Sequence, residues 1–201
     1  MIAASARIGP NAIIQTVDAM QQRYGEATAR QMLCQSGQPV LAAFAEHLPG
    51  EMVDEQAFYL LVQHLMVTIG GTAAAELLGH AGRQTADYLL VHRIPYPFQR
   101  IIKPLPPRVG LWLLLQAIRQ HAWTFVGSGT FRFVCLNPTR PPTLDLTYAP
   151  TVPVLASHFY GGTFARLFAV LINPHSNLEP QIEHEHDGNG AGYLRFRYTL
   201  R

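Results

Sequence analysis

The chain has 201 residues, of which 48% are hydrophobic and only 14% charged, a composition that excludes an intrinsically disordered chain and fits one domain with a sizeable core. The formal net charge of +2 is too small to indicate a nucleic-acid-binding protein. Because soluble domains usually carry about 25% charged residues, we expect a partner subunit, a ligand or a membrane face to cover part of the surface.

The cysteines and the hydrophobic runs narrow the class of protein further. Cys34 and Cys135 lie far apart without metal-binding spacing, which is typical of a reducing compartment. The N-terminal residues lack the basic and apolar regions of a signal peptide. The longest apolar runs, near 109–118 and 164–172, fall short of the roughly 18 residues that span a bilayer. We therefore expect a protein of the cytoplasm without a membrane span.

The first half of the sequence predicts helices. Hydrophobic residues recur every three or four positions after Asn11 and after Asp54, two residue types that cap helix N-termini, and a short helix is predicted over 26–35. Gly70-Gly71 breaks or bends the helix that Asp54 begins. The next helix runs to about residue 91, with Thr72 as its candidate cap.

A proline-rich stretch over 95–107 follows, and we expect a long irregular connection with a short apolar insert over 98–102. Two interpretations remain open for it, a functional loop and a passive linker. The helix predicted over 108–125 is apolar on most sides, so it should lie centrally in the fold.

The hydrophobic period then changes from helical to alternating. Residues 130–136 and 143–148 predict a hairpin, 154–172 predict a helix opened by Pro153, and 178–186 with 193–201 predict a closing hairpin. This order predicts an α+β fold in which a helical layer packs on an antiparallel sheet of about four strands. Within a single domain, 1–201, we place a helical part at about 11–126 and an αβ part at about 128–201.

Common catalytic and cofactor motifs are absent from the sequence. It has no glycine-rich dinucleotide or Walker motif, no G-x-S-x-G and no Cys-x-x-Cys, so no catalytic residue is assigned. On a strand, His184 and His186 would share one face and Glu183 and Glu185 the other, an arrangement that suits either a metal ion or a solvated edge strand. We assign no metal site.

Two other histidines are candidate ligands. His158 precedes Gly161-Gly162, and each glycine inside a helix costs about 1 kcal/mol relative to alanine. Close helix packing or a flat ligand pressed against the backbone would explain the pair. His121 lies beside Trp123 on the most apolar helix. For both histidines the alternative is a partly buried, hydrogen-bonded side chain.

The aromatic residues gather in the second half of the chain. At helical spacing they are typical of a core, and they can also line a pocket for a large flat apolar ligand. The candidate ligand-binding residues are His158, His121, Trp112, Trp123, Phe159, Tyr160 and Phe164.

Two stretches resemble a known family. ARIGPNAI (6–13) and HFYGGTFARLF (158–168) resemble the bacteriochlorophyll 4-vinyl reductases, the J proteins of bacteriochlorophyll biosynthesis, and the C-terminal part resembles the 4-vinyl reductase domain family. The resemblance implies a fold shared with ligand-sensing domains and a vesicle-tethering subunit, often as a homodimer. In that family the closing hairpin tends to carry cysteines, whereas 183–196 contain none.

The resemblance implies a function in bacteriochlorophyll biosynthesis. The ligand or substrate would be a magnesium tetrapyrrole such as divinyl protochlorophyllide or chlorophyllide, and no further cofactor is assigned. His158, or else His121, would be the axial ligand of magnesium. Arg195 or Arg197 would meet the ligand's carboxylates, and the alternative for these arginines is the solvated face of the last strand. Two rival functions are a vinyl-group reductase with an external electron donor and a non-enzymatic sensing or dimeric assembly module. Other enzymes of the pathway are candidate partners, and the surface of the photosynthetic membrane is an alternative location.

Overall fold

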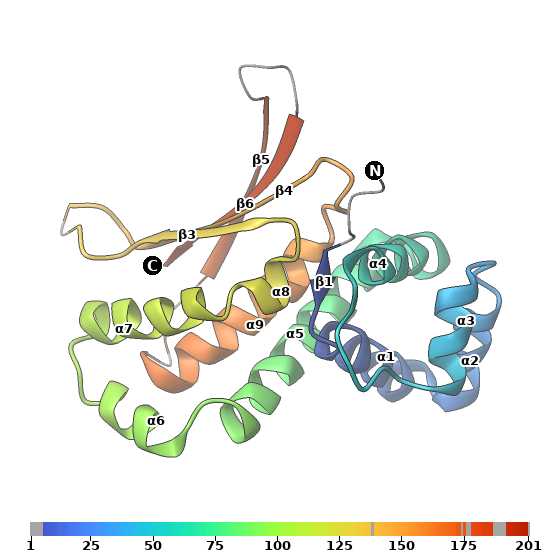
Figure 1. Cartoon of the computed structure of the whole chain (residues 1–201), viewed down its shortest axis with the longest axis horizontal. Helices are drawn as coiled ribbons and strands as arrows, with labels where there is room; N and C mark the ends of the chain where they lie inside the picture. The colour runs from blue at the N-terminus through green and yellow to red at the C-terminus, as the bar shows by residue number, and fades with distance from the viewer. Residues whose placement is uncertain (1–5, 138, 174, 176–177, 187–191, 201) are drawn as a thin grey trace.

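The computed structural model describes residues 6–137, 139–173, 175, 178–186 and 192–200. The fold is α+β, as the sequence predicts, with helices packed on an antiparallel four-stranded sheet (Figure 1). In chain order the elements are β1 (Arg7–Ile8), α1 (Asn11–Tyr24), α2 (Glu26–Cys34), α3 (Pro39–Glu46), β2 (Val53–Asp54), α4 (Glu55–Ile69), α5 (Gly71–His92), α6 (Tyr96–Ile102), α7 (Pro107–Gln120), α8 (Trp123–Val126), β3 (Thr130–Val134), β4 (Thr143–Tyr148), α9 (Ala156–Leu171), β5 (Leu178–His186) and β6 (Gly192–Leu200).

The main sheet has the strand order β3-β4-β6-β5, with every neighbouring pair antiparallel. Both predicted hairpins are therefore confirmed, and β6 joins them by pairing with β4. Leu146 lies between Phe131 of β3 and Phe196 of β6, and all three side chains are buried. The alternate residues, such as Asp145 and Arg197, occupy the outer face of the sheet.

Helices α5 and α9 pack closely against each other, and glycines make this close approach possible. A Cβ atom on Gly82 of α5 would overlap the carbonyl oxygen of Phe159, and one on Gly162 of α9 would overlap the carbonyl oxygen of Gly79. Gly161 instead faces the ring of Tyr198, 3.1 Å from its ideal Cβ position. Close packing, rather than a flat ligand, therefore occupies the space beside the glycine pair.

The residues at the helix N-termini agree only in part with the predicted caps. Asp54 caps α4 as expected, because its carboxylate accepts a hydrogen bond from the backbone N–H of Gln56 at 2.9 Å. The predicted cap Asn11 is instead the first residue of α1, and Pro10 occupies the cap position without a side-chain hydrogen bond. Helix α5 begins at Gly71, before the candidate cap Thr72.

The proline-rich stretch and the helix after it differ from the prediction. The apolar insert forms the short helix α6, because Pro95 and Pro97 suit the start of a helix and the Gln99 side chain donates hydrogen bonds to two backbone carbonyls at 2.7 and 2.9 Å. The single helix expected over 108–125 is broken after Gln120 into α7 and α8. The break at His121 lets the chain turn through Gly127, whose φ of +53° favours glycine, into β3.

Candidate ligand-binding site

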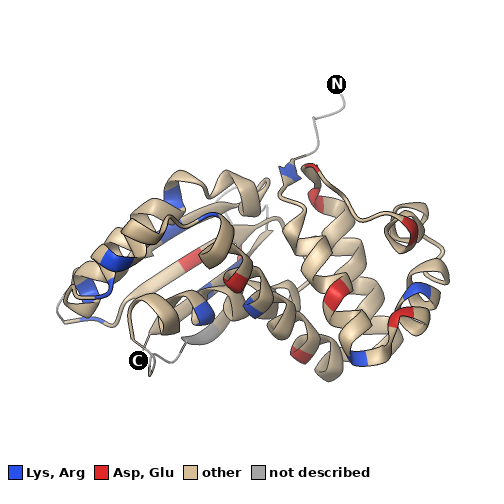
Figure 2. Cartoon of the chain, turned by 90° about the horizontal axis from the view of Figure 1, so that it is seen from below, with Lys and Arg blue, Asp and Glu red and all other residues tan. Residues whose placement is uncertain are grey.

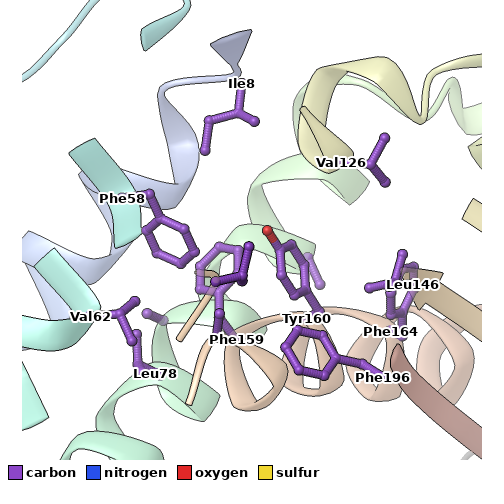
Figure 3. Packing of buried hydrophobic residues seen from close by; sticks show 14 of the residues in the cluster. Ile8, Phe58, Val62, Leu78, Val126, Leu146, Phe159, Tyr160, Phe164 and Phe196 are labelled. Atoms are coloured by element: carbon purple, nitrogen blue, oxygen red, sulfur yellow. The ribbon is translucent and has the colours of Figure 1, made fainter. Parts of the chain in front are cut away.

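Three of the aromatic residues expected at a ligand site lie together in the interior. Phe159, Tyr160 and Phe164 of α9 are buried between the helices and the sheet (Figure 3). The ring of Tyr160 stacks on that of Tyr148 with centroids 5.7 Å apart, and the ring of Phe159 meets that of Phe58 edge-on at 5.2 Å. These side chains fill the layer between helices and sheet with one another, as a core does.

Tyrosine hydroxyls lie inside this aromatic core. Tyr160 donates to the backbone carbonyl of Phe125 at 3.3 Å, and Tyr59 donates to the Glu55 carboxylate at 3.4 Å. The hydroxyl of Tyr148 is buried without a hydrogen-bond partner in the described part of the chain. Burial raises the pKa of Tyr160 to about 12 and the pKa values of Tyr59 and Tyr148 well above their ordinary range. At neutral pH these hydroxyls therefore keep their protons and cannot act as bases.

Glu55 is a buried residue that sequence reasoning missed. Its carboxylate accepts hydrogen bonds from the backbone N–H of Ser128 at 2.9 Å and from the Ser128 hydroxyl at 2.6 Å. A side chain on Gly127 would overlap the same carboxylate. Glu55 thus ties the start of α4 to the turn that leads into β3, joining the helices to the sheet.

His158 is half-buried in the first turns of α9, where its backbone carbonyl lies 3.9 Å from the ideal Cβ position of Gly79 on α5. Its ring has no hydrogen-bond partner among the residues that the structure describes. Burial lowers the pKa of His158 below its ordinary value of 6.5, which favours the neutral imidazole. A neutral imidazole is the form that ligates metals, so the axial-ligand role of His158 stays a prediction.

The pKa shift of His158 predicts a pH-dependent stability. Below pH 6.5 the unfolded chain takes up a proton at this position more readily than the folded chain, so the free energy of unfolding should fall as the pH is lowered. His158→Gln should reduce that fall, measured by urea denaturation at pH values above and below 6.5. An identical pH dependence in both proteins would contradict this assignment.

The other candidate ligand residues lie on the outside of the molecule. His121 is exposed at the end of α7, Trp123 on α8 is 60% exposed, and Trp112 on α7 is 36% exposed. The structure therefore does not bring the seven predicted residues into one cluster. Phe159, Tyr160 and Phe164 belong to the core, whereas His121 and the two tryptophans face outward.

An open groove of about 410 Å³ lies where the first turns of α7, the β3–β4 connection and the ends of α9 and β6 meet. Its size falls within the roughly 300–1,000 Å³ of small-molecule sites. The lining is mainly apolar, with two arginines among it. The residues are Pro107, Arg108, Leu111, Thr139, Arg140, Pro141, Pro142, Ile172, Asn173 and Leu200.

The two arginines of the groove have different roles. Arg108 donates hydrogen bonds to the backbone carbonyls of Cys135, at 3.4 Å, and of Asn137 and Arg140, so it holds the β3–β4 connection against α7. The Arg140 side chain is exposed and has no partner among the described residues, which leaves its guanidinium available to an anion. The groove thus combines apolar walls with one available cation.

Arg195 and Arg197, the arginines expected to meet ligand carboxylates, are engaged within the sheet. Arg195 pairs with Glu185 at 2.6 Å, and Arg197 pairs with Glu183 at 2.6 Å and with Asp145 at 3.2 Å. Glu183 and Glu185 therefore lie on the same face of the sheet as the two arginines.

The metal hypothesis for the two β5 histidines concerns side chains outside the described residues. Among the residues that the structure describes, no three His, Cys, Asp or Glu side chains gather closely enough to hold a metal ion. None of the described helices combines the length and the hydropathy needed to cross a membrane.

Sequence comparisons give two clear relatives, both named bacteriochlorophyll synthase 23 kDa chain, while no family model matches the chain. The protein from Cereibacter sphaeroides is 35% identical over 178 residues, which cover 86% of this chain and 82% of the relative. The protein from Rhodobacter capsulatus is 37% identical over 177 residues, which cover 86% of this chain and 79% of the relative.

Solved structures share the fold at low sequence identity. A protein studied for heme redox potential and protein-induced porphyrin distortion superposes with a TM-score of 0.58 and 10% identity, covering 96% of this chain and 99% of that one. The Fe(II) unliganded H-NOX protein from K. algicida superposes with a TM-score of 0.54 and 13% identity, covering 96% of this chain and 97% of that one. At such identities the likeness shows the fold alone, which is that of H-NOX domains.

Because the two sequence relatives align with most of their own length and most of this chain, the chain belongs to the family of the bacteriochlorophyll synthase 23 kDa chain.

Proposed function

We propose that the protein binds a magnesium tetrapyrrole intermediate of bacteriochlorophyll biosynthesis, such as divinyl protochlorophyllide or chlorophyllide, in the groove between α7 and the β3–β4 connection. The observation that carries the proposal is the pairing of apolar walls with the available guanidinium of Arg140. A tetrapyrrole intermediate offers the complementary chemistry, a flat apolar macrocycle with a carboxylate at its edge. The names of the relatives support the pathway, and the H-NOX-like fold supports a small-molecule ligand.

The expected affinity can be divided between apolar burial in the groove and the hydrogen bond from Arg140. Burial of roughly 300 Å² of macrocycle at about 25 cal/mol per Å² contributes about 7 kcal/mol, while association costs at least about 4 kcal/mol. The apolar contact alone would therefore give millimolar binding at best, since about 4 kcal/mol corresponds to that range. A charge-assisted hydrogen bond from Arg140, worth up to about 1 kcal/mol at an exposed site, improves the affinity by up to about fivefold.

The proposed contact with Arg140 predicts that Arg140→Gln loses affinity only for a ligand that carries a carboxylate. Arg140→Gln should weaken binding of magnesium protoporphyrin IX by up to about fivefold, measured by the shift of its absorption bands. The dimethyl ester of the same porphyrin has no carboxylate, so its affinity should be equal in the wild type and the variant. Arg132→Gln is the matched control, because Arg132 is an exposed arginine on the outer face of β3 and does not line the groove.

Other outcomes would move or overturn the proposed site. No histidine lines the groove, so the proposal assigns no axial protein ligand to magnesium there, and His158→Ala should change the affinity less than about twofold. If His158→Ala abolished binding and Arg140→Gln did not, the ligand would lie at the α5–α9 face instead. Absence of saturable binding to the wild type would overturn the proposal altogether.

The same complex tests vinyl-group reduction, the activity that the family resemblance implies. A divinyl tetrapyrrole bound to the protein would be incubated with NADPH or with reduced ferredoxin, and the pigment analysed for the loss of one vinyl group. Turnover would make the protein a reductase, whereas binding without turnover would support a carrier that assists another enzyme.

A further inference from the structure

One continuous stretch of the chain carries positive charge without any negative charge. Asp87 and Asp145 are the acidic residues on either side of it, and the 57 residues from 88 to 144 contain none. The same stretch contains seven basic residues, which are Arg93, Arg100, Lys103, Arg108, Arg119, Arg132 and Arg140. The small net charge of the whole chain therefore hides a strongly uneven distribution.

These basic residues also lack carboxylate partners. In the described part of the chain, none of the seven forms an ion pair, whereas Arg23, Arg30 and Arg166 on other helices pair with Glu76, Glu46 and Asp87. Figure 2 shows blue segments but no red ones along α6 and α7. Their positive charge is thus not neutralised within the molecule.

Exposed apolar side chains lie among these basic residues, and four of them, Val91, Tyr96, Ile101 and Val109, belong to residues 91–109, which we call the foot. Four others of the stretch lie outside the foot, at Trp112, Trp123, Val134 and Leu136. The foot runs from the last turn of α5 through α6 to the start of α7, at the lower edge of the molecule in Figure 1. Ile102 and Gly110 anchor it, because Ile102 is its one buried side chain and packs near Gly110. Tyr96 is 70% exposed and Ile101 59% exposed, and Val91 and Val109 are exposed as well.

We infer that the foot docks on the surface of an anionic lipid bilayer. Arg93, Arg100 and Lys103 would face the phosphate groups, each contributing attraction near a negatively charged membrane. Tyr96 and Ile101 would enter the interfacial layer, where aromatic and aliphatic side chains are favoured. The Arg100 guanidinium lies 6.0 Å from the centre of the Tyr96 ring, so the charged and apolar parts of the surface are contiguous.

Charge alone would also suit an acidic protein or a nucleic acid, but the exposed aliphatic side chains favour a bilayer. Ile101, Val91 and Val109 would find no apolar partner on a phosphate backbone, whereas a lipid interface accommodates them between the basic residues. Pro107 and Arg108 belong to both the foot and the lining of the groove. Docking would therefore bring the groove to the membrane surface.

Vesicle flotation with the full-length chain, and without any tetrapyrrole, tests the inference independently of the proposed ligand. We expect binding to vesicles of phosphatidylcholine mixed equally with phosphatidylglycerol, little binding to phosphatidylcholine alone, and a decline as salt is added, because salt screens surface charge. Equal binding to both lipid compositions, or no binding to either, would overturn the inference.

Matched variants test the role of the foot. Arg100→Glu should weaken vesicle binding about fivefold or more, whereas Arg83→Glu, an equal change at an exposed position on α5 outside the foot, should leave it within about twofold. Tyr96→Ser with Ile101→Ser should weaken binding at high salt more than at low salt, since the charge attraction remains. These side chains are exposed, so circular dichroism should show unchanged folding. If Arg83→Glu weakened binding as much as Arg100→Glu, the attraction would come from overall charge and the foot would not be the docking surface.

Discussion

Replacing Gly82 by alanine is expected to lower the free energy of unfolding by at least about 3 kcal/mol. The new Cβ would overlap the backbone carbonyl of Phe159 and lie 2.9 Å from the backbone nitrogen of Thr163. Both obstacles are main-chain atoms in the middle of α9, so no side-chain rotation relieves the overlap. The two helices must separate, and the aromatic residues of α9 that pack on the sheet must move with them.

Gly79 provides the matched control one turn earlier on α5. A Cβ there would lie 3.7 Å from the Arg83 side chain and 3.9 Å from the carbonyl oxygen of His158, which are ordinary contacts. Because alanine is favoured over glycine inside a helix by about 0.5–1 kcal/mol, Gly79→Ala should stabilise the protein by about that amount. Urea denaturation of both variants measures the difference, and a similar loss of stability in both would contradict the close-packing explanation.

The sequence allowed the elements with strong periodicity or a clear local signal to be predicted. The alternating residues of β4 and β6 place Leu146 and Phe196 inside and Asp145 and Arg197 outside, because a strand has a period of two. Asp54 predicts the start of α4, because its carboxylate can accept a hydrogen bond from a backbone N–H that has no partner within the helix. These signals are local, so they do not depend on the rest of the fold.

Features that depend on tertiary contacts could not be predicted in the same way. The break between α7 and α8 is not evident in the hydrophobic pattern, since Ile118, Ala122 and Phe125 keep helical spacing across it. Arg108 and Arg140 are 32 residues apart, and only the return of the β3–β4 connection to α7 brings them to one groove. The sequence NPTRPP over 137–142, which joins β3 to β4, indicates a proline-rich connection but not its position in the fold.

The pattern of aromatic residues likewise predicts burial but not what the buried side chains contact. A helical pattern of aromatic residues predicts which face of α9 is apolar, and this face is indeed buried through Phe159, Tyr160 and Phe164. The pattern does not say whether that face meets a ligand or other side chains, because the burial free energy of an aromatic ring is similar in both cases. In the structure the rings of Phe58 and Tyr148 occupy the space.

Removing the carboxylate of Glu55 is expected to lower the free energy of unfolding by about 3 kcal/mol. In Glu55→Ala, the buried hydroxyl of Tyr59 and the part-buried N–H and hydroxyl of Ser128 lose their acceptor, and a buried donor without a partner is costly. Glu55→Gln retains one acceptor oxygen and should lose about half as much. The measurement is urea denaturation at neutral pH.

A double-mutant cycle separates the Glu55–Ser128 contact from the other effects of truncation. Ser128→Ala alone should cost about 1 kcal/mol, because the carboxylate then loses one of its donors. Adding Ser128→Ala to Glu55→Ala should cost almost nothing, since the contact is already absent, so the coupling energy should be about 1 kcal/mol. If the two losses instead added within about 0.3 kcal/mol, the Ser128 hydroxyl would not help the carboxylate to hold the turn into β3, and the Ser128 backbone N–H would remain as the hydrogen-bonded link from this turn to Glu55.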